Sequence, residues 1–127
     1  MFKTLKTFLD NGANINIALS NFCHYLKYST DEEFTNVISE DATALINDFS
    51  DELKVSLAAT IEWYCDNRNI EKPMWIYKPG YYFLKETFPA KIYKNHMEYL
   101  IPTLKKYSPV QFSRRNLFVS EDACDCC

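Results

Sequence analysis

The sequence predicts an all-α protein: a compact bundle of four to five helices, followed by a proline- and aromatic-rich wrap and a short C-terminal strap. Over the first 70 residues, apolar side chains recur every three or four positions, which is the spacing of a helix with one buried face. The chain holds only 2 glycines, too few for the tight hairpins of an antiparallel sheet. Its 127 residues suit a single domain with a real core.

Four helices are expected before residue 50. Apolar spacing predicts helices over residues 2–9 and 15–26. Thr30 and Glu33 have the spacing of a capping box, which predicts the start of a third helix. A fourth, short helix is expected over residues 42–49.

The clearest helix follows Ser50. This serine is a suitable N-cap, and Asp51 and Glu52 lie in the first turn, where the helix dipole favours acids. We expect the helix to end near residues 67–69. Its predicted buried stripe consists of Leu53, Leu57, Ala58, Ile61, Tyr64 and Cys65.

The second half of the chain is richer in proline and aromatic residues. Pro73, Pro79 and Pro89 rule out one long helix, so we expect an irregular segment that crosses the helical core. Residues 96–107 predict a last helix that is started or interrupted by a proline, and residues 111–119 are expected to be extended or a single turn. The expected anchors of the irregular segment are Trp75, Tyr81, Tyr82, Phe83 and Phe88.

Charge divides the single domain, residues 1–127, into three parts. The acidic helical part, residues 1–70, has 5 basic and 11 acidic residues, a net charge of −6. Within the basic, aromatic-rich part, residues 71–121, the stretch 72–115 has 9 basic and 2 acidic residues, a net charge of +7. A cysteine-rich tail, residues 122–127, follows. This asymmetry predicts either a polar partner or attraction between the two halves.

The odd number of cysteines and the lack of a long apolar run predict a cytoplasmic protein. No apolar run approaches the roughly 20 residues that span a bilayer, and the first residues lack the pattern of a signal peptide. Five cysteines, an odd number, fit a reducing compartment. Cys124, Cys126 and Cys127 could bind zinc or copper, but their spacing is not that of a structural zinc site. We favour a tail without metal and expect no cofactor.

No catalytic motif is present, and we predict a non-enzymatic protein. Cys65 lies on a predicted apolar stripe and is expected to be an inert core thiol. The pairs of neighbouring acids fall at predicted helix starts, where electrostatics explains them. An enzyme would need a cleft that holds His24 or His96 beside a carboxylate.

The late segment SPVQFSRRNLFV places Arg114, Arg115 and Asn116 among apolar residues. An arginine cannot lose its charge, and its burial without a partner is costly. One interpretation is therefore a clamp, in which the strap is tied across the helices by ion pairs. The other is a protein-binding surface, because arginine beside aromatic residues is typical of interface hot spots. The surface would contain Arg114, Arg115 and Asn116, with Trp75, Tyr77 and Phe112 as anchors.

Binding of a single-stranded nucleic acid is the alternative function. Lysines alternate with tyrosines and a tryptophan over residues 72–107, so that cations could meet phosphates while rings stack on bases.

The motifs in the second half also resemble a known group of proteins. These motifs are Pro73-Met74-Trp75, the aromatic run from Tyr81 with Phe88-Pro89, and the pattern S-P-x-x-F-x-R-R-N-hydrophobic-F-V over residues 108–119. They are similar to a group of small bacterial proteins with an FRRRNIFV-like signature, often encoded beside nucleotidyltransferase-like toxin–antitoxin genes. The resemblance implies a helical, antitoxin-like accessory protein that binds a nucleotidyltransferase-type toxin. Relatives continue differently after Asp122, and the first 70 residues resemble the group only in being helical.

Overall fold

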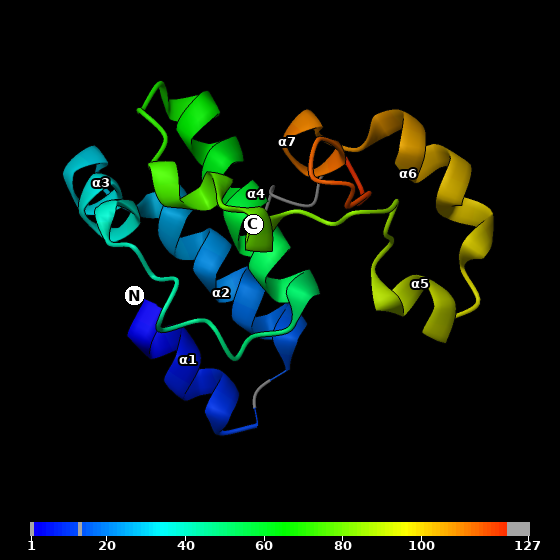
Figure 1. The fold of residues 1–127 in the computed structure, drawn as a ribbon, viewed down its shortest axis with the longest axis horizontal. Coiled ribbons are helices and arrows are strands. Elements are labelled where there is room, and N and C mark those ends of the chain that lie inside the picture. The colour runs from blue at the N-terminus through cyan, green and yellow to red at the C-terminus, as the bar shows by residue number, and fades with distance from the viewer. Residues whose placement is uncertain (1, 13, 122–127) are drawn as a thin grey trace.

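The computed structural model describes residues 2–12 and 14–121, and these residues form an all-α fold, as predicted (Figure 1). Four helices of nine residues or more make up the first half: α1 (Phe2–Asp10), α2 (Ile15–Tyr28), α3 (Asp31–Ser39) and α4 (Asp51–Arg68). The second half contains the short α-helices α5 (Ala90–Lys94), α6 (Ile101–Tyr107) and α7 (Val110–Ser113), with the 3-10 turns η1 (Met74–Tyr77), η2 (Pro79–Tyr81) and η3 (Glu98–Leu100).

Helix α4 is the centre of the fold. It contacts α2, η1, η2 and α7, and it is buried on almost every side between residues 53 and 65. The expected cap is present, because the Ser50 side chain accepts a hydrogen bond from the Leu53 amide. The helix ends at Asn69, whose left-handed backbone (φ 57°) is a conformation that asparagine tolerates.

The capping box of α3 is also confirmed. The Glu33 amide donates to the Thr30 hydroxyl, and the Thr30 amide donates to the Glu33 carboxylate. These bonds lower the pKa of Glu33, the backbone one most strongly. From α4, Arg68 reaches back to the end of α2 and donates to the carbonyls of Leu26, in its last turn, and Ser29, just after it.

The prediction of a helix over residues 42–49 was wrong. This segment forms successive turns, with bonds from the Ile46 amide to Ala42 and from the Phe49 amide to Ile46. The Asp41 carboxylate accepts from both the amide and the hydroxyl of Thr43, at 2.9 and 2.6 Å. A short polar side chain that binds nearby backbone in this way favours a turn over a regular helix.

The wrap, which we define as residues 71–87, crosses the helical bundle after α4, and the strap is residues 108–119. Trp75 is buried at its start, and its indole N–H donates to the Ile38 carbonyl at the end of α3. Its ring packs edge-on against Phe2 of α1 and Tyr81 of η2. One side chain of the wrap therefore contacts both α1 and α3.

A second, smaller core lies beyond the bundle. We call residues 88–107 the α5–α6 lobe, and Figure 1 shows α5 and α6 to one side of the bundle, with α7 between. Ile92 and Leu104 are buried in it against Phe118 of the strap, whose ring stacks on Phe88 at 5.6 Å. An isolated parallel bridge between Thr87, just before the lobe, and Leu117 of the strap lies beside this core.

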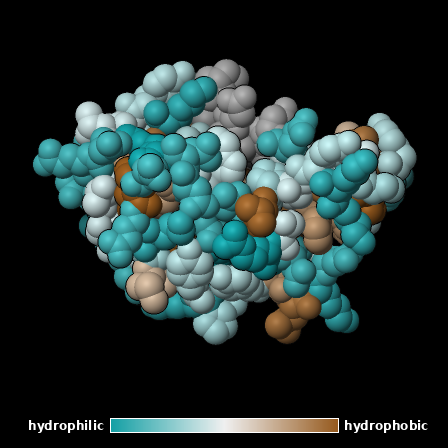
Figure 2. Space-filling view, turned by 90° about the horizontal axis from the view of Figure 1, so that it is seen from above, coloured by the Kyte–Doolittle hydropathy of each residue, from teal (hydrophilic) through white to brown (hydrophobic). Residues whose placement is uncertain are grey.

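The face of the molecule seen in Figure 2 is mostly hydrophilic. On the face seen in Figure 2, brown hydrophobic residues stand apart from one another among teal ones. No helix within the described ranges is both long enough and apolar enough to cross a membrane.

Candidate partner-binding site

A buried carboxylate on α4 organises the region around the two arginines. Glu62 is 1% exposed, and it lies on the same helical face as Ala58 and Cys65, which are also buried. Three groups from outside α4 approach its carboxylate. The Tyr77 hydroxyl donates to Oε2 at 2.8 Å, and Arg115 and Arg114 lie 3.4 and 3.5 Å away. These partners offset the cost of taking the charge out of water.

Arg115 points inward and holds the wrap in place. Its Nη1 donates to the carbonyls of Ile76 and Tyr81, at 2.8 and 3.1 Å, and its Nη2 faces Glu62. The guanidinium carbon lies 4.6 Å from the centre of the Tyr82 ring and 5.6 Å from that of the Tyr77 ring. The cation thus lies near two aromatic rings and is bonded to two carbonyls, whereas its buried Nε has no hydrogen-bond partner among the described residues.

Asn116 fastens the strap to the wrap. Its backbone is left-handed (φ 62°), and its side chain donates to the Phe83 carbonyl at 2.9 Å. The flanking main chain adds bonds from the Phe83 amide to Arg115 and from the Thr87 amide to Asn116. The clamp interpretation of the segment therefore agrees with the observed contacts.

Arg114 points outward. Its side chain is 53% exposed, although its Nη1 stays 3.5 Å from Oε2 of Glu62. One carboxylate thus serves two guanidinium groups, so the cluster of Glu62, Arg114 and Arg115 has a surplus positive charge at its exposed edge.

A second polar cluster lies close to Arg114. Asp66 accepts hydrogen bonds from Lys72 and from the largely buried Gln111. Burial alone would raise the pKa of Asp66, but these two bonds, helped by the charge of Arg114, lower it. Conversely, burial and the hydrogen bond to Glu62 raise the pKa of Tyr77, so this phenol remains a proton donor to the carboxylate.

The structure divides the six predicted partner-binding residues into two groups. Trp75, Phe112 and Arg115 are buried and line the interior. Arg114 is exposed, and Tyr77 and Asn116 are partly exposed. The surface that a partner could reach is therefore the Arg114 edge, which we define as Arg114 with Tyr77 and Asn116.

Sequence reasoning missed Glu62, the residue that both arginines face. A signal was present, because position 62 lies one helical turn after Ala58 and one before Cys65, both on the predicted apolar stripe. An acid inside an apolar stripe indicates a buried, paired charge.

The histidines and cysteines give no reactive centre among the described residues. His24 and His96 are both exposed, and burial raises the pKa of the Cys65 thiol to about 12, which keeps it unreactive. In residues 2–12 and 14–121, no three His, Cys, Asp or Glu side chains gather as metal ligands. Cys124, Cys126 and Cys127 lie outside the described residues.

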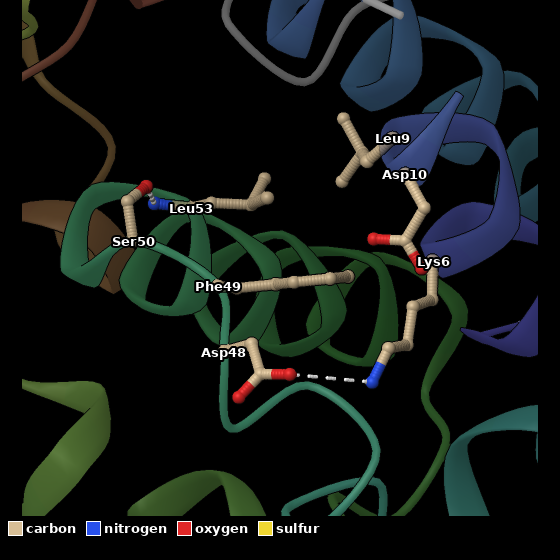
Figure 3. A pocket seen from close by; sticks show the side chains of 7 residues that line it. All are labelled: Lys6, Leu9, Asp10, Asp48, Phe49, Ser50 and Leu53. Atoms are coloured by element: carbon tan, nitrogen blue, oxygen red, sulfur yellow. Dashed lines mark hydrogen bonds and ion pairs between the residues drawn. The ribbon is translucent and has the colours of Figure 1, made fainter. Parts of the chain in front are cut away.

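Two small clefts occur away from the arginines. The first, about 270 Å³, lies between α1 and the start of α4, where Lys6 pairs with Asp48 at 3.6 Å (Figure 3). The second, about 260 Å³, lies between the turns after α3 and η2, beside Lys54 and Lys78. Neither is lined by a histidine or by Glu62.

The fold and this site define a class: an all-α protein with a buried arginine–glutamate centre beneath an exposed arginine. Comparison with protein-family models, with curated proteins and with solved structures finds no match to this chain.

Proposed function

We propose that the protein is a non-enzymatic, cytoplasmic accessory protein that binds a protein partner through the Arg114 edge. The observation that supports this most directly is the shared carboxylate. Because Glu62 is already bonded by Tyr77 and Arg115, its contact with Arg114 leaves that guanidinium half-exposed and only partly neutralised.

The chemistry of the edge favours an acidic partner group. A guanidinium can bind a carboxylate through two parallel hydrogen bonds, and such charge-assisted bonds contribute about 1.5–3 kcal/mol each. The turn at α7 and the bonded Asn116 hold the backbone on either side of Arg114 in place, so the main chain loses little conformational freedom on binding.

The resemblance of residues 73–119 to the small bacterial proteins supports an antitoxin-like role. In this proposal, the partner is a nucleotidyltransferase-type toxin that presents an Asp or Glu to Arg114. The buried residues of the same motif, Trp75 and Arg115, then serve to position the edge rather than to touch the partner.

A matched pair of variants tests the proposal. Lys105 is also an exposed cation paired with a carboxylate, 3.0 Å from Glu86, but it lies in the α5–α6 lobe. Partners captured from the native cell with the wild-type protein are identified by mass spectrometry, and the Kd is measured with purified components. Arg114→Gln should weaken binding at least tenfold without a change in Tm, whereas Lys105→Gln should not. Equal affinity of Arg114→Gln and the wild type would refute the proposal.

A further inference from the structure

The α5–α6 lobe carries a concentration of basic and aromatic side chains. Residues 88–107 include 4 lysines and 1 acid, a net charge of +3. All four lysines, Lys91, Lys94, Lys105 and Lys106, are exposed. So are three tyrosines of the same lobe, of which Tyr99 is the most open at 74%, with Tyr93 and Tyr107 at 51%.

These tyrosines are not needed to close the small core. That core is formed by Ile92, Leu104 and Phe118, with Phe88 stacked on the last of these. Exposed aromatic rings that serve no packing role are available to a ligand.

The cations and rings of the lobe lie close enough to act together. In α6, the Lys106 amine is 5.3 Å from the centre of the Tyr107 ring. In α5, Lys91 and Lys94 are three residues apart and flank Tyr93. A lysine and a neighbouring tyrosine of the lobe can therefore contact the phosphate and the base of one nucleotide.

We propose that the α5–α6 lobe binds single-stranded nucleic acid, with lysines on the phosphates and tyrosines stacked on the bases. A strand with free bases offers both phosphate charge and aromatic faces, which is the pairing that lysine and tyrosine provide. The proposal does not depend on the Arg114 edge.

Three observations favour a single strand over a duplex or a protein partner. The helices α5 and α6 have 5 and 7 residues, too short to lie along a major groove as a recognition helix does. All of the lobe's formal positive charges are lysines, a residue that protein–protein interfaces tend to exclude. The net charge of −6 over residues 1–70 would also repel a strand and direct it to the lobe.

The chain contains a matched control for the Lys106–Tyr107 pair. On α2, the Lys27 amine lies 5.6 Å from the centre of the exposed Tyr28 ring, so the two pairs have the same composition and order, and both tyrosines are exposed. Only the first pair belongs to the proposed surface. Both double-alanine variants should keep the wild-type Tm.

The experiment measures fluorescence anisotropy of labelled oligothymidylate and oligouridylate, each about 20 nucleotides long, as salt is varied. If about three phosphates are neutralised, the log of the affinity should fall with log salt at a slope of about −2. Lys106→Ala with Tyr107→Ala should weaken binding at least tenfold, whereas Lys27→Ala with Tyr28→Ala and Arg114→Gln should leave it unchanged. Binding of either probe with this pattern of variant effects supports the proposal.

Three results would overturn this inference. The first is no binding of either probe at low salt, and the second is an equal loss in the two double variants. The third is binding of inorganic polyphosphate as tight as that of the oligonucleotides, with Tyr99→Ala unchanged. That result would show that the α5–α6 lobe recognises negative charge alone, as it would in binding an acidic protein.

Discussion

The guanidinium of Arg115 and the carboxylate of Glu62, which are 53 residues apart in the sequence, meet at 3.4 Å with both side chains shielded from water. This pair joins the strap to the central helix. Because the same guanidinium binds the carbonyls of Ile76 and Tyr81, one side chain connects three segments of the chain.

Arg115→Ala should lower the free energy of unfolding by about 3–5 kcal/mol, because it leaves a buried carboxylate short of a partner and two carbonyls unbonded. Arg115→Lys should restore only part of this loss, since an ammonium cannot reproduce the planar fork. Urea unfolding followed by circular dichroism measures the effect, with Arg114→Ala as the control. A loss below about 1 kcal/mol for Arg115→Ala would contradict the clamp.

Asn116 should be more sensitive to alanine than to glycine. Alanine removes the bond to Phe83 and resists the left-handed backbone, which predicts a loss of about 2 kcal/mol, whereas glycine loses the bond alone. Asn69 is the comparison, because it is also left-handed, but its role is to end α4. Asn69→Gly should therefore be close to neutral when the free energy of unfolding is measured in urea as above. A similar loss at both positions on substitution by glycine would argue against the side-chain bond.

The pair of Asp41 and Lys78 should make stability depend on pH in acid. Hydrogen bonds from Lys78 and then Thr43 lower the pKa of Asp41 from 3.8 to about 2. Since the folded-state pKa is depressed, the contribution is complete above the unfolded pKa and is lost as pH falls from about 4 towards 2.

Asp41→Asn should accordingly have a lower Tm than the wild type at neutral pH, and the difference should vanish near pH 2. Adding Lys78→Met to this variant should cost little more, because both changes remove one interaction. A Tm difference that persists unchanged to pH 2 would show that the carboxylate acts through something other than its charge.

Phe118 should couple the α5–α6 lobe to the bundle. Phe118→Ala removes the ring that packs on Phe88, Ile92 and Leu104, so residues 88–107 should exchange amide hydrogens much faster. Exchange in α2 and in the middle of α4 should change little, because these segments belong to the main core. Uniform acceleration over the whole chain would mean that the lobe has no independent stability.

Local signals in the sequence were sufficient for much of the fold. The caps at Thr30 and Ser50 and the buried stripe of α4 depend on residues within a few positions of each other, and all are observed. The prediction of a helix over residues 42–49 failed because the bonds between Asp41 and Thr43 favour a turn there. Apolar spacing does not reveal this competition.

The candidate site depended on contacts that no local pattern contains. Charge and polarity are the same for Arg114 and Arg115, and only the turn at α7 and the left-handed Asn116 decide that the second faces inward. Its partner, Glu62, is 53 residues away. The proposal of an ion pair could therefore be made from the sequence, but not which arginine is buried or which acid receives it.

The two carbonyls that Arg115 binds impose an order on folding. Ile76 and Tyr81 leave the ribosome 39 and 34 residues ahead of the guanidinium that bonds them. Helices α1 to α4 can pack in the meantime. The carbonyls of Ile76 and Tyr81 in the wrap, however, lack the Arg115 donor until the strap has been synthesised. The aromatic middle of the chain is thus secured only once the strap has been made, and its exposure to proteases or chaperones is greatest before then.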